Sequence, residues 1–101
     1  MLLEFSTFPA GEKSMSQYVA GVIDIIDKSG LPYQTHALGT LVEGDWDQLM
    51  DLVKQCHMHL RSDFDRVYTR ITIDDREGSS GRITGKVESI EQKLGRKIKK
   101  N

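Results

Sequence analysis

The chain has 101 residues, of which 38% are hydrophobic and 29% charged, with a formal net charge of -1 at pH 7. These values are typical of one small globular domain, so we expect a single domain over residues 1–101. The charge balance excludes a general attraction to nucleic acid or anionic lipid, and no apolar run approaches the roughly 20 residues that cross a bilayer. The single cysteine, Cys56, cannot form an internal disulfide, and the first residues lack a signal-peptide pattern, so we expect a cytoplasmic location.

The first third of the chain predicts a strand followed by a helix. Residues 2–8 mix Leu, Phe and Thr ahead of Pro9, which is typical of a strand that ends in a turn. Ser14 and Gln17 have the spacing of a capping box, and the apolar residues after them recur at helical spacing. Gly30 and the proline soon after it predict the end of this helix.

A pair of short strands is expected next. Residues 33–38 and 40–43 are extended runs that flank Gly39, so we expect a hairpin with a tight turn near this glycine. The pair Asp45 and Gln48 then forms a second candidate capping box. The residues that follow place an apolar stripe on one face of an amphipathic helix that ends near Arg61.

The last third of the chain begins with a strictly alternating segment. From Arg66 to Asp75, one face carries an apolar series and the other a polar series, which predicts a strand with one face in the core. The apolar series consists of Val67, Thr69, Ile71 and Ile73. The Gly- and Ser-rich residues 77–81 predict a loop, and the apolar spacing of residues 83–94 predicts a final helix closed by Gly95.

The order of these elements predicts the fold class. Strand, helix, strand, strand, helix and strand is the α+β, ferredoxin-like βαββαβ arrangement, here with an additional C-terminal helix. We expect an antiparallel four-stranded sheet with both main helices on one face and an uncovered opposite face. Polar side chains are expected on or near that open face: Gln34, His36, Tyr68, Arg70 and Thr72.

Three segments in order carry a resemblance to a known family. They are SMSQYVAGVIDIIDKSGLPYQ (residues 14–34), HALGTLVEGDWDQLMDLVKQCH (residues 36–57) and RVYTRITIDDR (residues 66–76). Together they resemble the small thiamine-binding protein family of ferredoxin-like domains. The resemblance implies a homo-oligomer, usually dimers that pair into tetramers. It also implies that thiamine or its hydroxymethylpyrimidine moiety binds near subunit contacts, with no cofactor and no catalysed reaction.

Residues 35–46 and the start of the first helix hold the polar candidates for such a site. Glu43 could accept hydrogen bonds from an aminopyrimidine, while Thr40 and Ser16 could supply hydroxyl partners. Glu43 could instead be a solvated carboxylate that favours the N-terminus of the second helix. Ser16 could instead help to cap the first helix.

The aromatic and imidazole candidates are Tyr18, Tyr33, Trp46 and His36. Tyrosine and tryptophan rings could stack on a ligand ring or face a thiazolium cation, but each of these three also fits a place in the core. Trp46 lies on the apolar stripe of the second helix, so we expect a buried anchor there. His36 lies in the hairpin and is either a ligand contact or an ordinary sheet-face histidine.

Metal and phosphate sites receive less support. Cys56, His57 and His59 occupy helical positions that do not converge as two histidines four residues apart would. We expect His57 to border the core, His59 to be exposed and Cys56 to be a buried hydrophobe. The GSSGR segment (residues 78–82) could cradle a phosphate but lacks the full P-loop pattern, so a connector is the simpler interpretation.

Other function classes on this fold fit less well. An acyl phosphate hydrolase would need an arginine-bearing phosphate loop after the first strand, and FPAGEKSMS (residues 8–16) has no arginine. An RNA-binding module would need a basic surface. The alternative that stays open is a regulatory or structural oligomer that senses another small metabolite.

Overall fold

The computed structural model describes residues 1–11, 16–78, 83 and 90–98. Within this part of the chain the elements follow the predicted ferredoxin-like order, and residues 90–94 form a short further helix. The elements are β1 (Leu2–Pro9), α1 (Ser16–Lys28), β2 (Tyr33–His36), β3 (Gly39–Glu43), α2 (Trp46–Arg61) and β4 (Val67–Asp74).

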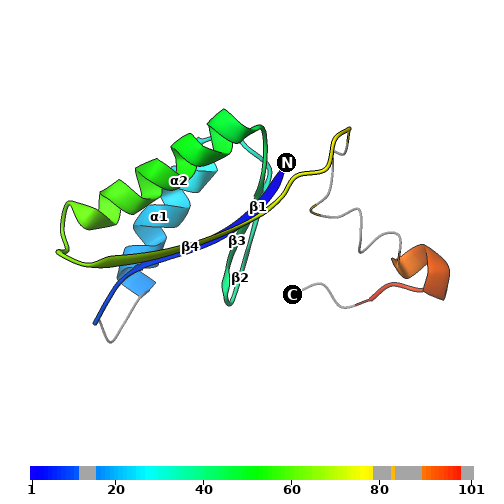
Figure 1. The fold of residues 1–101 in the computed structure, drawn as a ribbon. Helices are drawn as coiled ribbons and strands as arrows, with labels where there is room; N and C mark the ends of the chain where they lie inside the picture. Colours follow the sequence, from blue (N-terminus) through cyan, green and yellow to red (C-terminus); the bar gives the residue numbers. More distant parts are fainter. Residues whose placement is uncertain (12–15, 79–82, 84–89, 99–101) are drawn as a thin grey trace.

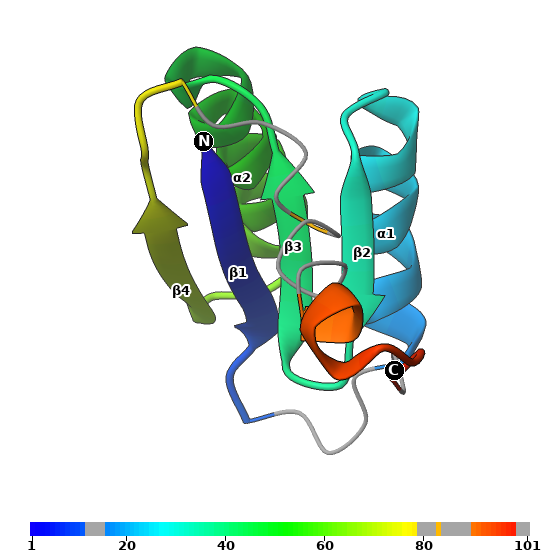
Figure 2. The same ribbon diagram turned by 90° about the vertical axis from the view of Figure 1, so that its right-hand side faces the viewer.

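The strands form one antiparallel sheet in the order β2-β3-β1-β4. Both long helices lie on the same face of this sheet (Figure 1), with α1 behind β2 and α2 behind β1 and β3 (Figure 2). The short helix near the C-terminus lies on the opposite side (Figures 1 and 2). The sheet therefore has one face covered by α1 and α2 and one open face.

The core lies between the sheet and the two helices. Along β1, side chains alternate between buried and half-buried, so that Leu3 and Phe5 point toward the helices. These two residues and Val42 of β3 pack against apolar side chains of both helices, which are Val22, Ile26, Leu49, Leu52, Val53, Cys56 and Leu60. Burial of this set supplies the main favourable free energy of folding.

The predicted capping box of α2 is confirmed. The Gln48 backbone N–H donates to Asp45 Oδ1 at 2.8 Å, and the Asp45 backbone N–H donates to Gln48 Oε1 at 3.1 Å. These bonds satisfy backbone groups that a helix start otherwise leaves without intrahelical partners. The predicted cap at Ser14 lies outside the described residues.

The predicted hairpin with a tight turn near Gly39 is confirmed, although its first strand ends at His36 and not at Leu38. The turn is formed by Ala37 and Leu38, whereas Gly39 is already the first residue of β3. A Cβ atom at Gly39 would lie 2.8 Å from the carbonyl oxygen of Phe5. The glycine is therefore required by the close approach of the β1 backbone and not by the turn.

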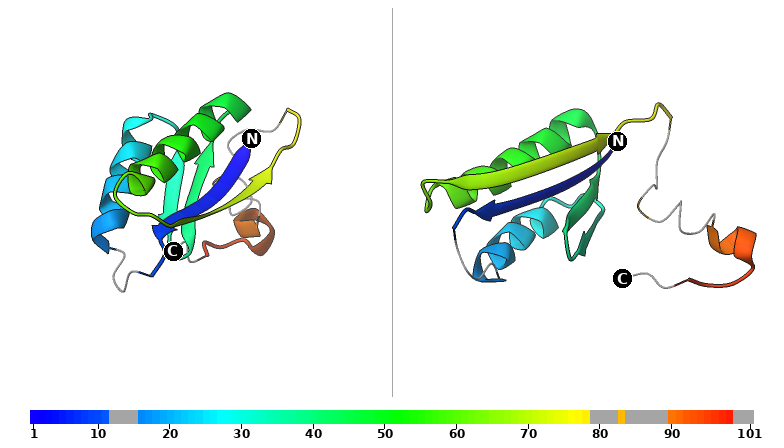
Figure 3. Two further views of the ribbon diagram at one scale, coloured as in Figure 1. Left: turned by 60° about the vertical axis from the view of Figure 1, so that its left-hand side comes forward. Right: turned by 60° about the horizontal axis from the view of Figure 1, so that its bottom comes forward.

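The predicted core face of β4 points to the correct side of the sheet, but its side chains are less buried than expected. Ile71 pairs with Phe5 and Ile73 with Leu3, so both point to the helix side of the sheet. They are nevertheless 43% and 37% exposed. β4 is the outermost strand (Figure 3), so it has a neighbouring strand on one side only.

The predicted final helix is described only in part. Residues 90–94 are helical, and Gly95 follows with a φ of 69°, as expected for a glycine that closes a helix. The Gly95 backbone N–H donates to the Glu91 carbonyl oxygen at 2.8 Å. Residues 84–89 and most of the predicted loop lie outside the described residues.

Candidate binding site

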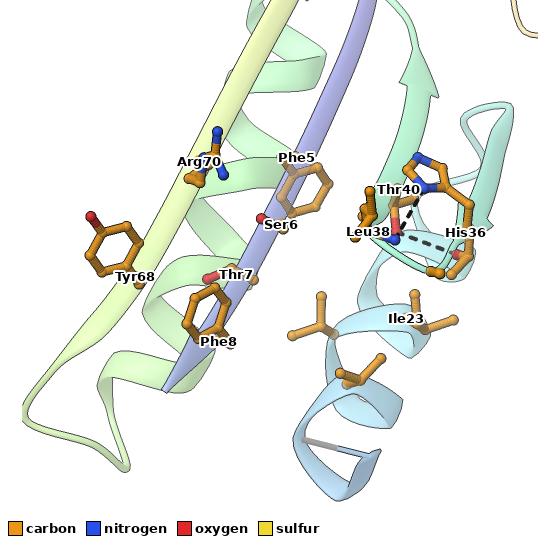
Figure 4. Close-up of a pocket in the computed structure, with 15 residues that line it drawn as sticks. Phe5, Ser6, Thr7, Phe8, Ile23, His36, Leu38, Thr40, Tyr68 and Arg70 are labelled. Atoms are coloured by element: carbon orange, nitrogen blue, oxygen red, sulfur yellow. Dashed lines mark hydrogen bonds between the residues drawn. The ribbon is translucent and has the colours of Figure 1, made fainter. Parts of the chain in front are cut away.

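A cavity of about 550 Å³ opens beside the second half of β1. Its size falls within the range of sites for small organic ligands. Figure 4 shows β1 and β4 running together while the hairpin that carries His36, Leu38 and Thr40 lies apart from them. The described lining comes from five elements and the hairpin turn: Phe5, Ser6, Thr7, Phe8, Val19, Val22, Ile23, Thr35, His36, Ala37, Leu38, Gly39, Thr40, Tyr68 and Arg70.

Unequal strand lengths create this cavity. The β1–β3 ladder ends at the pair Phe5 and Thr40, whereas the β1–β4 ladder continues to the pair Pro9 and Val67. Residues 6–9 of β1 therefore have a paired neighbour on one side and the cavity on the other. The apolar face of α1 forms the floor of this gap with Val19, Val22 and Ile23.

An aromatic pair borders the cavity on the β4 side. Phe8 and Tyr68 are partners across the ladder, and their rings are stacked with centroids 5.8 Å apart and an interplanar angle of 18°. Tyr68 is 50% exposed. The pair offers an aromatic surface to a flat ligand ring.

Threonine hydroxyls provide neutral hydrogen-bonding groups on the hairpin side. Thr40 is 5% exposed, and its Oγ1 lies 3.4 Å from Thr35 Oγ1. A hydroxyl has one donor and two acceptor positions, so this contact leaves both threonines able to bond a ligand. Thr7 differs, because its Oγ1 points toward β4 (Figure 4) and lies 2.7 Å from Thr69 Oγ1.

The imidazole of His36 has both nitrogens occupied. The Leu38 backbone N–H donates to His36 Nδ1 at 3.3 Å, so the ring proton belongs on Nε2. Nε2 lies 2.9 Å from Glu4 Oε2 and donates to it. His36 therefore offers the cavity the surface of its ring and no free nitrogen.

Arg70 is the one described lining residue with a permanent charge. It lies on the open face of β4, opposite Ser6 in the ladder and two residues after Tyr68. No Asp or Glu is among the described lining residues. The cavity is thus an apolar space with aromatic, hydroxyl and guanidinium groups at its borders.

The model of a family described as thiamine-binding protein matches residues 3–91. The chain belongs to this thiamine-binding protein family. A relative from Methanothermobacter thermautotrophicus, named only as a UPF0045 protein, is 38% identical over 95 residues, which cover 90% of this chain and 96% of the relative.

Solved structures of relatives agree with the fold. A hypothetical protein from Methanocaldococcus jannaschii superposes with a TM-score of 0.81 and 34% identity, covering 90% of this chain and 95% of that one. A Thermotoga maritima protein, named as a candidate thiamine biosynthesis or salvage protein, gives a TM-score of 0.77 and 26% identity, with 88% and 96% coverage. The thiamine-binding family is therefore shown both by sequence and by fold.

The structure brings two of the predicted site residues together at the cavity, namely Thr40 and His36. Glu43 lies elsewhere, at the far end of β3, where it pairs with Leu2 and is half-buried. Trp46 begins α2 and is 57% exposed, so the expectation of a buried anchor is wrong.

The two predicted tyrosines have roles in packing. Tyr18 packs against the core, and its ring meets that of Phe64 edge to face with centroids 4.8 Å apart. The Tyr33 hydroxyl donates to Asp27 Oδ1 at 3.0 Å, and this bond raises the pKa of Tyr33. Neither tyrosine is among the described cavity residues. Ser16 is the first residue of α1, and its side chain lies outside the description.

Sequence reasoning missed the aromatic pair and the arginine as parts of one site. The strict alternation of β4 already placed Tyr68 and Arg70 on one face, and Phe8 lies on the matching face of β1. The missing information was the register and the early end of the β1–β3 ladder. No hairpin turn joins β1 to β4, so turn geometry does not fix their register in the sequence.

The second helix carries the residues considered for a metal. Cys56 is fully buried, His57 is half-buried with Nδ1 2.7 Å from Thr69 Oγ1, and His59 is exposed, all as expected. Within the described residues no cluster of His, Cys, Asp or Glu could hold a metal ion. The described helices also include none that is long and apolar enough to span a membrane.

Proposed function

We propose that this protein binds thiamine or its hydroxymethylpyrimidine moiety in the cavity beside the second half of β1, without catalysing a reaction. The observation that carries the proposal is the cavity itself, which has an apolar floor, an aromatic border and threonine hydroxyls in a member of the thiamine-binding family. These groups suit a flat heteroaromatic ring with hydrogen-bonding edges.

The aminopyrimidine ring matches the described groups one by one. Its faces would contact the Phe8 and Tyr68 rings or the side chains of α1, and its nitrogen-bearing edge would meet the hydroxyls of Thr35 and Thr40. Hydroxyls can donate to a ring nitrogen and accept from an amino group. No charged partner is required for this part of the molecule.

Calorimetric titration with hydroxymethylpyrimidine, and separately with thiamine, tests the proposal. A matched pair of variants locates the site: Val19→Phe places a larger side chain at the cavity floor, and Ala20→Phe adds the same group at the next, exposed position of α1 outside the described lining. We expect saturable micromolar or tighter binding in wild type and Ala20→Phe, and a loss of at least tenfold in Val19→Phe.

Two results would contradict the proposal. Absence of binding for both ligands would favour the alternative, an oligomer that senses another small metabolite. Unchanged affinity in a folded Val19→Phe protein would move the site away from this cavity.

The role of Glu43 as a ligand contact stays a prediction, and the same titration checks it. Glu43→Gln keeps the size of the side chain and removes its charge. If the carboxylate bonds the ligand, affinity falls by about 1.5 to 3 kcal/mol, the range for hydrogen bonds to charged groups. Unchanged affinity would restrict the site to the cavity and exclude Glu43.

We also propose that the chain self-associates as a dimer or tetramer. Exposed apolar groups on the β4 edge, Ile71 and Ile73, and the open sheet face with Tyr68 support this proposal, since association would remove them from water. Light scattering coupled to gel filtration measures the mass. A monomer at micromolar concentration would contradict this part of the proposal.

A further inference from the structure

We propose that Arg70 makes the mouth of the cavity a position for an anion, and that the preferred ligand is a phosphorylated form of the pyrimidine. This inference rests on the proposed function and adds the charge class of the ligand. It starts from the distribution of charge around the cavity, in which Arg70 has no carboxylate beside it among the described lining residues.

Arg70 differs in its surroundings from the paired cations Lys28 and Arg61. Lys28 Nζ lies 2.8 Å from Asp24 Oδ2, and Arg61 Nη1 donates to the Phe64 carbonyl oxygen at 3.0 Å. Arg70 has no hydrogen bond or ion pair to any described residue, although it lines a cavity. Its five N–H donors therefore stay available to a ligand.

The nearby carboxylate of Glu4 is held on the other side of the cavity mouth. Glu4 pairs with Thr72 in the ladder, one step along the open face from the pair Ser6 and Arg70. Its Oε2 accepts from His36 Nε2 at 2.9 Å. This bond directs the carboxylate toward the hairpin and away from β4, so that the guanidinium keeps its unneutralised charge.

The charge of Arg70 discriminates among the possible ligands. Thiamine carries a fixed positive charge on its thiazolium ring, and no described lining carboxylate offsets it. A phosphate group, by contrast, accepts the paired N–H bonds of a guanidinium. Ser6, opposite Arg70 in the ladder, adds a hydroxyl donor at the same mouth. We therefore expect affinity to fall from hydroxymethylpyrimidine phosphate to hydroxymethylpyrimidine to thiamine.

Calorimetric titrations with four probes test this order: hydroxymethylpyrimidine phosphate, hydroxymethylpyrimidine, thiamine and inorganic phosphate. In the wild type we expect the phosphorylated pyrimidine to bind at least about tenfold tighter than the unphosphorylated one, as a charge-assisted bond provides. Inorganic phosphate alone should bind far more weakly, because it lacks the ring.

Two charge-removing variants form the matched comparison. Arg70→Gln should abolish the gain from the phosphate, so that this variant binds the phosphorylated and unphosphorylated pyrimidines with affinities within about twofold of each other. Lys54→Gln removes a positive charge from an exposed position of α2 outside the described lining, and it should keep the full gain. Because Arg70 is exposed, circular dichroism should show a folded Arg70→Gln protein.

The outcomes separate this inference from the proposed function. If hydroxymethylpyrimidine binds but its phosphate gives no gain, or if the gain persists in Arg70→Gln, the anion position is wrong and the proposed function stands. If inorganic phosphate binds as tightly as the phosphorylated pyrimidine, the inference that the cavity recognises the ring and the phosphate together is wrong. If no pyrimidine binds, the proposed function itself fails.

Discussion

The two halves of β1 differ in their surroundings, although the same alternation of side chains runs through both. Residues 2–5 are paired with β3 and β4, and their inward side chains Leu3 and Phe5 are almost fully buried. Residues 6–9 are paired with β4 alone and border the cavity. The length of the β2–β3 hairpin therefore decides which half supports the fold and which half can bind a ligand.

The largest effect is expected when a core side chain in residues 2–5 of β1 is truncated. Leu3→Ala removes a side chain with no exposed surface and leaves a space that the core cannot fully collapse around. We expect the free energy of unfolding to fall by about 2 to 5 kcal/mol. Urea denaturation measures the free energy of unfolding. Ser6→Ala, in residues 6–9 of β1, is the control, with an expected change within about 0.5 kcal/mol. Equal losses of stability in both variants would contradict the difference between residues 2–5 and residues 6–9 of β1.

The next effect concerns the point where the two halves meet. Gly39→Ala would place a methyl group 2.8 Å from the Phe5 carbonyl oxygen, so β3 must move away from β1. We expect a loss of about 1 to 3 kcal/mol in stability, the usual cost of an added group in a packed site. Thermal or urea unfolding checks this value. Wild-type stability would show that the ladder end can shift freely, and that the cavity does not depend on this contact.

A change at the cavity border should affect ligand binding more than folding stability. Tyr68→Ala removes one ring of the stacked pair, and half of the residue's surface is already exposed. We expect hydroxymethylpyrimidine to bind about 0.5 to 1.5 kcal/mol more weakly, the range for an aromatic pair. Calorimetric titration measures the affinity, and Tyr68→Phe should restore it. A Tyr68→Ala protein with full affinity would remove the aromatic pair from the site.

The smallest effect at neutral pH concerns the thiol in the closed core. Burial raises the pKa of Cys56 from 9.0 to about 12, so the thiol stays protonated and inert in the folded protein. We expect iodoacetamide to label Cys56 only after unfolding at pH 8. Because the pKa is raised on folding, the thiol disfavours the folded state progressively as the pH rises from about 9 toward 12. Rapid labelling of the folded protein would show that the core around Cys56 opens readily.

The order of elements and the main core could be predicted because they depend on local patterns. The Asp45 and Gln48 cap needs only a spacing of three residues, and the stripe of α2 needs only helical periodicity. Ile71 shows the limit, because its pattern predicts the correct face but not its place on an edge strand. Whether an apolar residue is covered depends on the neighbouring elements.

The candidate site was less predictable than the fold for the same reason. Thr40 and His36 could be chosen from one segment, but their relation to Phe8, Tyr68 and Arg70 depends on register between distant strands. The choice of Glu43 assumed that neighbours in sequence share a site. In β3, however, Thr40 pairs at the ladder end near the cavity, and Glu43 pairs at the opposite end.

The most direct test of the account is an NMR titration of the isotope-labelled protein with hydroxymethylpyrimidine, followed through its backbone amide signals. The account predicts that shifts concentrate in residues 5–8 of β1, residues 35–40 of the hairpin and residues 68–70 of β4, which border the cavity. Shifts that concentrate instead around Glu43 and Trp46, with the signals of the cavity residues unchanged, would contradict the account. They would place the site at the end of β3 opposite the cavity.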